Sequence, residues 1–177
     1  LRFLGAISHE PEYIDAFKTG KDLHSKTATF LYEKPVEEIS YKERARGKGY
    51  NFAVNYGSSA WGLAFNFNIS VDEAQLYLDK FFAGYKVLKQ FKDQAEKLIW
   101  ENKYTATPLG RNRYFEDKRV FKDSWERDRY ISRVKREGFN TIIQGGINDV
   151  VKLAMQKIFY DSPFGYDKLR ILLQTHD

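Results

Sequence analysis

The sequence predicts an α+β fold that is predominantly helical, and three observations support this prediction. Residues 44–56 carry related side chains at every fourth position, which is the spacing of one helical face. Between residues 76 and 99, apolar side chains recur at intervals of three and four, as they do on amphipathic helices. The β-prone runs at 104–115 and 168–175 are short. We therefore expect helices with a few strands.

Capping residues mark the elements before the central helix. An apolar stretch opens the chain, and two short helices are expected to begin at Ser8 or Pro11 and at Asp22, because these residue types favour helix starts. A turn from Pro35 to Ser40 then delivers the chain into the central helix.

The central helix contains two glycines, Gly47 and Gly49, on either side of Lys48. Each glycine costs about 0.5–1 kcal/mol relative to alanine inside a helix. Close approach of a ligand or of another backbone accounts for this cost, and a mobile helix is the alternative. Gly57 and Ser58 are expected to end the helix.

The elements after the central helix are predicted to form a support and a hairpin. Trp61 to Phe67 is a short apolar segment, and Ser70 to Glu73 has the pattern of a capping box for the next helix. The two amphipathic helices that follow are broken near Gly84, and we interpret them as a buttress. A hairpin is expected about Pro108–Arg111.

The central helix carries a chemically graded stripe. Arg44 and Lys48 come first, then Phe52, then Tyr56, each one helical turn apart. Cations aligned with flat rings suit a ligand that has phosphate at one end and a sugar and base at the other, which is a nucleotide. The alternative is a solvated basic face with Phe52 and Tyr56 in the core, and the spacing alone favours this alternative.

A second polar stripe comprises Arg136, Asn140 and Gln144, again four residues apart. An arginine contacts phosphate or a base edge, and the two amides can donate and accept in a nucleic-acid groove. The alternative is a polar helix face that satisfies buried backbone groups. Asp149 begins the apolar helix that follows, and we expect it to be structural.

Composition restricts the class of protein. A chain of 177 residues can bury one core, and its net charge of +5, from 29 basic and 24 acidic residues, weakly favours a polyanionic partner. Without cysteine there is no disulfide and no thiolate metal site, which permits an intracellular location. We find no membrane-spanning run or signal peptide and expect no membrane partner. Leu1 and the end of the chain do not look like natural termini, so we expect a fragment.

The pattern R-x-x-x-K-x-x-x-F-x-x-x-Y-G, from Arg44 to Gly57, resembles the fingers helix of family A DNA polymerases, the bacterial DNA polymerase I group. The resemblance implies that Arg44 and Lys48 hold the phosphates of the incoming deoxynucleotide, with Lys48 also acting in catalysis. It implies that Phe52 packs beside the sugar and base and that Tyr56 stacks at the templating position.

Other stretches resemble the same family, so that the resemblance covers essentially the whole chain. His24 matches a histidine near the nucleotide's phosphates, and Arg111 and Arg113 in the hairpin resemble residues that touch the template backbone. The R-x-x-x-N-x-x-x-Q stripe resembles the face that touches the minor-groove side of the primer terminus. Leu1 and Arg2 resemble the residues that follow the first catalytic motif, which places its aspartate upstream of this chain.

The end of the chain resembles the second catalytic motif of the family. Lys168 to Thr175 reads as a strand that leads into His176 and Asp177. The resemblance implies that His176 contacts DNA and that Asp177 binds Mg²⁺ together with the upstream aspartate. Two such ions activate the primer hydroxyl and stabilise the leaving pyrophosphate.

We therefore expect a fragment of the polymerase domain of a right-hand DNA-directed DNA polymerase, with fingers at roughly 10–125 and part of the palm at roughly 126–177. Its expected partners are primer-template DNA, a dNTP and the rest of the palm and thumb, in the cytoplasm, at the nucleoid or in viral replication in a host cell. The alternatives are a single-subunit RNA polymerase, which shares the arginine, lysine and tyrosine-glycine spacing and an HD motif, and a non-catalytic nucleic-acid-binding module. Phe52 and the R-x-x-x-N-x-x-x-Q stripe favour DNA.

Overall fold

The structure is a computed structural model that describes residues 1–118, 120–161 and 171–174. As predicted, the described chain is predominantly helical with a small antiparallel sheet, in which Thr105 pairs with Arg113. The elements in chain order are α1 (Arg2–Ser8), α2 (Pro11–Thr19), α3 (Leu23–Tyr32), the 3₁₀ turn η1 (Val36–Glu38), α4 (Tyr41–Asn55), α5 (Ala60–Phe67), α6 (Val71–Gly84), α7 (Lys86–Asn102), β1 (Tyr104–Ala106), β2 (Asn112–Tyr114), α8 (Ser124–Asn140), the π-helix η2 (Thr141–Gly145) and α9 (Gly146–Asp161).

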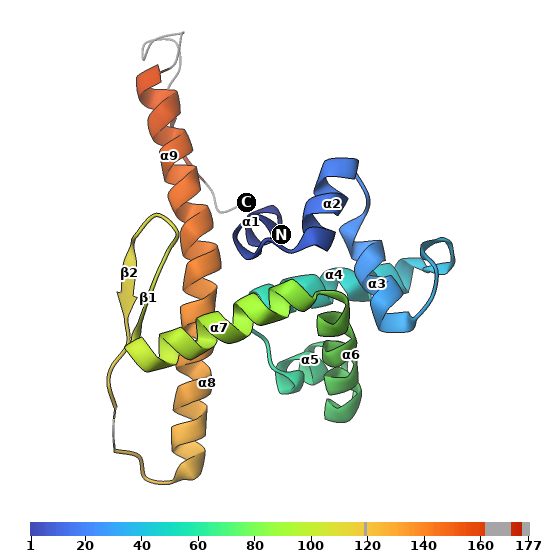
Figure 1. Ribbon diagram of the computed structural model, residues 1–177, viewed down its shortest axis with the longest axis horizontal. Helices are drawn as coiled ribbons and strands as arrows, with labels where there is room; N and C mark the ends of the chain where they lie inside the picture. The colour runs from blue at the N-terminus through green and yellow to red at the C-terminus, as the bar shows by residue number, and fades with distance from the viewer. Residues whose placement is uncertain (119, 162–170, 175–177) are drawn as a thin grey trace.

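The helices form two groups that α7 connects. α8 and α9 follow one another as a single long column with the β-hairpin beside it (Figure 1). α7 crosses this column and extends to the other group, which contains α1 to α6 (Figure 1). In that group, α4 packs chiefly against α3, and α5 packs against α6. The central helix therefore lies between the N-terminal helices and the column.

The junction of α6 and α7 is packed around Tyr85, which is fully buried. Its ring lies edge-on to Tyr13 and to Phe30, with centroids 4.9 and 5.2 Å away, and 4.8 Å from the centroid of Phe81. A Cβ atom on Gly84 would lie 2.2 Å from the ring of Phe30. The predicted helix break near Gly84 is confirmed, because α6 ends at Gly84 and α7 begins at Lys86. The close approach of the Phe30 ring explains why this position is a glycine.

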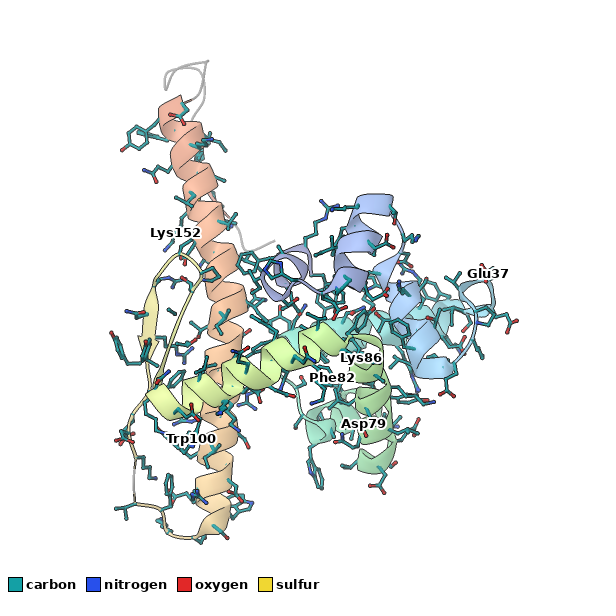
Figure 2. The ribbon with its side chains drawn as sticks, in the orientation of Figure 1. Glu37, Asp79, Phe82, Lys86, Trp100 and Lys152 are labelled. Atoms are coloured by element: carbon teal, nitrogen blue, oxygen red, sulfur yellow. The ribbon has the colours of Figure 1, made fainter. Side chains whose placement is uncertain are left out.

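The predicted buttress is also confirmed, because α7 packs along α8. Trp100 lies near the end of α7 at the column, with its ring centroid 6.4 Å from that of Tyr130 on α8 (Figure 2). At Gly138 of α8, an added Cβ atom would lie 2.6 Å from Ile99. This contact brings the two helices close together and fixes the column relative to the N-terminal group.

Most predicted boundaries agree with the structure. Pro11 is the first residue of α2, and the carboxylate of Asp22 caps α3. At the predicted capping box, Ser70 accepts from the backbone of Glu73, and the complete reciprocal box forms instead between Ser40 and Glu43 at the start of α4. Within the described residues, no helix is long and apolar enough to cross a membrane.

The opening apolar stretch, to which the sequence assigned no element, is the helix α1, which lacks a side-chain cap and is too short for the helical spacing of apolar residues to be recognised. One prediction of local structure was wrong. The strand predicted at 168–175 is described only at 171–174, where the chain has no regular structure. A strand needs a neighbouring strand for its backbone hydrogen bonds, and among the described residues β1 and β2 pair with each other.

Candidate functional site

The predicted stripe occupies the exposed side of α4. Lys48 is exposed, and the residues Phe52 and Tyr56 are 41% and 47% exposed. The opposite side of the helix packs into the core through Tyr50 and Val54, which are buried. Phe52 and Tyr56 are therefore surface rings, and the alternative that places them in the core is excluded.

The two glycines of α4 allow close approach of neighbouring groups. A Cβ atom on Gly47 would lie 2.5 Å from the carbonyl oxygen of His24 and 3.0 Å from the backbone nitrogen of Ala28. On Gly49 it would lie 2.5 Å from the ring of Phe67. Close approach of another backbone, one of the predicted causes, is confirmed at Gly47. It brings α3 against α4 and places His24 beside the stripe.

His24, Lys48 and Phe52 lie together, although they come from two helices. The ring centroid of Phe52 is 6.0 Å from that of His24 and 5.9 Å from the Lys48 Nζ atom. Burial of the His24 ring lowers its pKa, and the nearby Arg44 and Lys48 lower it further against the opposing effect of Asp22. The lowered pKa favours the neutral imidazole, which offers a ligand a hydrogen bond rather than a charge.

Arg44 is held by a carboxylate from α3. Its Nε atom lies 2.5 Å from Oδ2 of Asp22, and its Nη2 atom lies 3.2 Å from Oδ1. Desolvation raises the pKa of Asp22, but the hydrogen bonds from Arg44, from Ser25 and from the His24 backbone outweigh it and lower the pKa to about 2. A phosphate that binds Arg44 must therefore compete with this ion pair.

The end of α4 meets the second stripe. Gly57 has a φ of +68°, and a Cβ atom there would lie 3.0 Å from Cγ of Arg136 on α8. A pocket of about 490 Å³ is lined by Tyr56 together with Asn140 and Gln144. The structure therefore brings the last residue of one predicted stripe to the second and third residues of the other.

The second stripe is not one continuous α-helix, which corrects the expected spacing. Arg136 and Asn140 belong to α8, whereas Gln144 lies in the π-helix η2. A π turn contains an extra residue and is frequent at functional sites. The Oδ1 atom of Asn140 is buried and has no hydrogen-bond partner among the described residues.

The two hairpin arginines bind protein groups of the column. Arg111 donates from Nε to Oδ1 of Asp149 at 3.0 Å, and Arg113 donates from Nη2 to Oε2 of Glu137 at 2.5 Å. Thr107 also donates to Asp149, so the structural role predicted for this aspartate is confirmed. Both arginines also line a pocket of about 430 Å³, together with Asn140 and Gln144.

The predicted metal ligand cannot be placed. His176 and Asp177 lie outside the described residues. Within the described ranges, no group of three or more His, Cys, Asp or Glu side chains could hold a metal ion.

Sequence reasoning missed two contributors to the site, namely the carboxylate of Asp22 at Arg44 and the amide of Asn51. Asn51 is fully buried on α4 and lies 3.2 Å from Nδ1 of His24. A polar residue between buried Tyr50 and Val54 was the available signal, because buried polar groups need partners.

Comparison with known proteins identifies the family. The sequence profile of DNA polymerase family A matches residues 1–177. The DNA polymerase I of Caldicellulosiruptor bescii is 33% identical over 177 residues and that of Mycobacterium leprae 35% over 179, covering all of this chain and 20% and 19% of those proteins. These matches place the chain among the nucleic-acid polymerases. Within that class it belongs to DNA polymerase family A.

A solved structure has a similar fold. It is the POL domain of Pol1 from M. smegmatis in complex with DNA primer-template and dNTP, with a TM-score of 0.82 and 31% identity. The match covers 99% of this chain and 30% of that one. The chain thus spans about a fifth of the length of the relatives named above.

Proposed function

We propose that this chain forms the fingers, at roughly 10–125, and an adjoining part of the palm, at roughly 126–177, of a DNA-directed DNA polymerase. The observation that carries the proposal is the pocket that Tyr56 shares with Asn140 and Gln144. It joins a stripe suited to a nucleotide to a stripe suited to a duplex. A polymerase needs its two ligands side by side because the incoming nucleotide must meet the primer end.

The nucleotide extends along α4 in this proposal. Arg44 and Lys48 bind its phosphates through charge-assisted hydrogen bonds, which are roughly twice as strong as neutral ones. His24 adds a neutral donor beside them, and the exposed ring of Phe52 packs against the sugar and base. Tyr56 then stacks where the nucleotide meets the template.

The duplex lies against the column and the hairpin. Arg136, Asn140 and Gln144 face its minor groove, where acceptors occupy similar positions in every base pair. This suits an enzyme that must accept every correct pair. Arg111 and Arg113 approach the template backbone from the hairpin, and a phosphate competes there with Asp149 and Glu137.

The cofactor we propose is Mg²⁺, with Asp177 and an aspartate outside this chain as its ligands. Carboxylate oxygens are the donors that Mg²⁺ prefers. Bound there, such ions supply activation of the attacking hydroxyl and stabilisation of the leaving group. The proposed partners are primer-template DNA, a dNTP and the remaining palm and thumb. An enzyme with this substrate works where the DNA is held, which is the cytoplasm in the proposed setting.

Replacement of Lys48 tests the proposed binding of the nucleotide's phosphates. Removing a hydrogen bond to a charged group costs about 1.5–3 kcal/mol, so Lys48→Ala is expected to slow single-turnover dNTP incorporation by at least about tenfold. The measurement uses the polymerase that contains this chain. Lys42→Ala is the matched control, because Lys42 is exposed on the same helix but lies off the stripe.

If Lys48→Ala and Lys42→Ala incorporate dNTP equally fast, Lys48 belongs to a solvated face. The same assay with ribonucleotides separates a DNA polymerase from an RNA polymerase. Absence of any extension, with primer-template still bound, would indicate the non-catalytic binding module.

A further inference from the structure

We propose that Asn51 is a positioning residue for His24. Its side-chain amide donates to Nδ1 of the imidazole and so holds the ring in the tautomer that carries its proton on Nε2. This inference rests on the proposed function, because it assigns a task to the histidine beside the nucleotide's phosphates. It concerns a residue on the buried side of α4, one position before Phe52.

The amide of Asn51 is fully engaged by three groups from two other helices. Its Nδ2 atom lies 2.8 Å from Oγ1 of Thr27 and 3.2 Å from Nδ1 of His24, both on α3. Its Oδ1 atom accepts a hydrogen bond of 3.0 Å from the hydroxyl of Tyr13 on α2. Asn51 and Thr27 are fully buried, so water does not substitute for these partners.

The hydrogen-bond count at Thr27 shows which group donates. Its hydroxyl donates to the carbonyl of Leu23 at 2.9 Å, which uses its single proton. Thr27 must therefore accept from Asn51 and also from the hydroxyl of Tyr85, which is 2.7 Å away. The threonine oxygen thus requires the NH₂ end of the Asn51 amide on its side.

The same count fixes the orientation of the amide. With Nδ2 toward α3, its two protons reach Thr27 and His24, and Oδ1 accepts from Tyr13, so that every donor is used. In the flipped orientation, Nδ2 would face only the Tyr13 hydroxyl, and one buried proton would lack an acceptor. An unpaired buried donor costs about 1–3 kcal/mol. The NH₂ group therefore points at Nδ1 of His24, which must be unprotonated to accept.

A neutral imidazole with an unprotonated Nδ1 carries its proton on Nε2. Within the described part of the chain the ring is hydrogen-bonded at Nδ1, which leaves Nε2 for a ligand. Burial and the nearby cations Arg44 and Lys48 lower the pKa of the ring and so favour its neutral form. By holding the ring in this tautomer, Asn51 lets Nε2–H of His24 donate to a phosphate oxygen. The ring does not have to take up a proton first.

The tautomer of His24 in the ligand-free chain is measured directly by ¹⁵N NMR of the imidazole nitrogens above the pKa of the ring. The expected spectrum shows a pyridine-type Nδ1 and a pyrrole-type Nε2. A ring with its proton on Nδ1 overturns the inference. This readout needs no variant and no bound nucleotide, so it is independent of the proposed function.

Two hydroxyl-removing variants test whether the amide network sets the tautomer. Thr27→Val removes the oxygen that requires the NH₂ end of the Asn51 amide on its side, and part of the ring population is expected to shift to the Nδ1–H form. Tyr50→Phe is the control, because the Tyr50 hydroxyl is also buried but has no partner among the described residues. An unchanged spectrum in Thr27→Val contradicts the network.

Asn51→Asp replaces the donor by an acceptor and should move a proton onto Nδ1. With dATP as the probe, its affinity for the chain is expected to fall by about tenfold, since a hydrogen bond to a charged group is lost. In the His24→Ala background the same substitution should have no further effect. An equal loss in both backgrounds overturns the inference. If wild-type chain has the Nε2–H ring but binds no dATP, the proposed function fails and the tautomer assignment stands.

Discussion

At the scale of single residues, one of the two cations of the α4 stripe is restrained before any ligand arrives. Arg44 makes two hydrogen bonds to Asp22, while Lys48 is exposed beside Phe52. Asp22 also caps α3 by accepting from the backbone nitrogens of His24 and Ser25. One carboxylate therefore links the start of α3 to the phosphate end of the stripe.

Asp22→Ser separates these two tasks, because serine keeps a capping oxygen but removes the charge. Without its competitor, Arg44 is expected to bind dATP about two- to fivefold more tightly, the range of an exposed ion pair. Titration of the chain with dATP measures the affinity. Asp15→Ser is the control, since Asp15 pairs with Lys21 away from the stripe. Equal affinities in wild type and Asp22→Ser would show that Arg44 does not hold the phosphates.

The difference in the free energy of unfolding between wild type and Asp22→Ser is expected to depend on pH. The pKa of Asp22 is lowered to about 2 in the folded chain, against about 3.9 when unfolded. Its contribution to the free energy of unfolding is therefore present above about pH 4 and is lost as the pH falls toward 2. Urea unfolding of wild type and Asp22→Ser should differ at pH 6 and converge near pH 2. A difference that persists at the lowest pH would contradict this assignment.

At the scale of elements, close contacts that depend on glycine hold α4 in place. A Cβ atom on Gly47 meets the backbone of α3, which cannot move aside as a side-chain tip can. Gly62 in α5 provides a contrast, because the nearest atoms to its Cβ position lie 3.8 Å away in Ser58. The two helical glycines therefore differ in what they contribute.

Gly47→Ala is expected to destabilise the chain by roughly 1–3 kcal/mol through overpacking. Gly62→Ala should stabilise it by about 0.5–1 kcal/mol, since alanine loses less backbone entropy on folding. Chemical denaturation of the two variants gives both free energies of unfolding. Equal effects would mean that α3 and α4 are not in the close contact seen at His24.

Sequence patterns predicted the elements whose signals are local and missed what depends on contacts. Asp22 and Pro11 marked helix starts correctly because capping is decided within one turn. The π turn at Gln144 and the partners of Asn51 depend on residues distant in sequence, so no local pattern reports them. α1 lacks a capping side chain, and it is too short for the helical spacing of its apolar residues to be recognised.

At the scale of the whole molecule, the chain holds the proposed nucleotide and duplex stripes but only one of the two proposed metal ligands. We expect the 177-residue chain to bind primer-template DNA and to show no magnesium-dependent primer extension. Gel-based extension with radiolabelled primer, beside a binding assay, tests both statements. Robust extension by the isolated chain would show that the second aspartate is not required.

The pocket shared by Tyr56, Asn140 and Gln144 joins the two helix groups and gives the last prediction. If Gln144 contacts the duplex rather than the nucleotide, Gln144→Ala should slow extension in the complete polymerase while the affinity of the chain for dATP stays unchanged. Gln90→Ala is the control, because Gln90 is an exposed glutamine on α7. Thermal unfolding of each variant distinguishes a structural effect from a functional one. A Gln144→Ala protein that melts at a lower temperature but extends primer normally would show that the second stripe has only a structural role, satisfying buried backbone groups of the column.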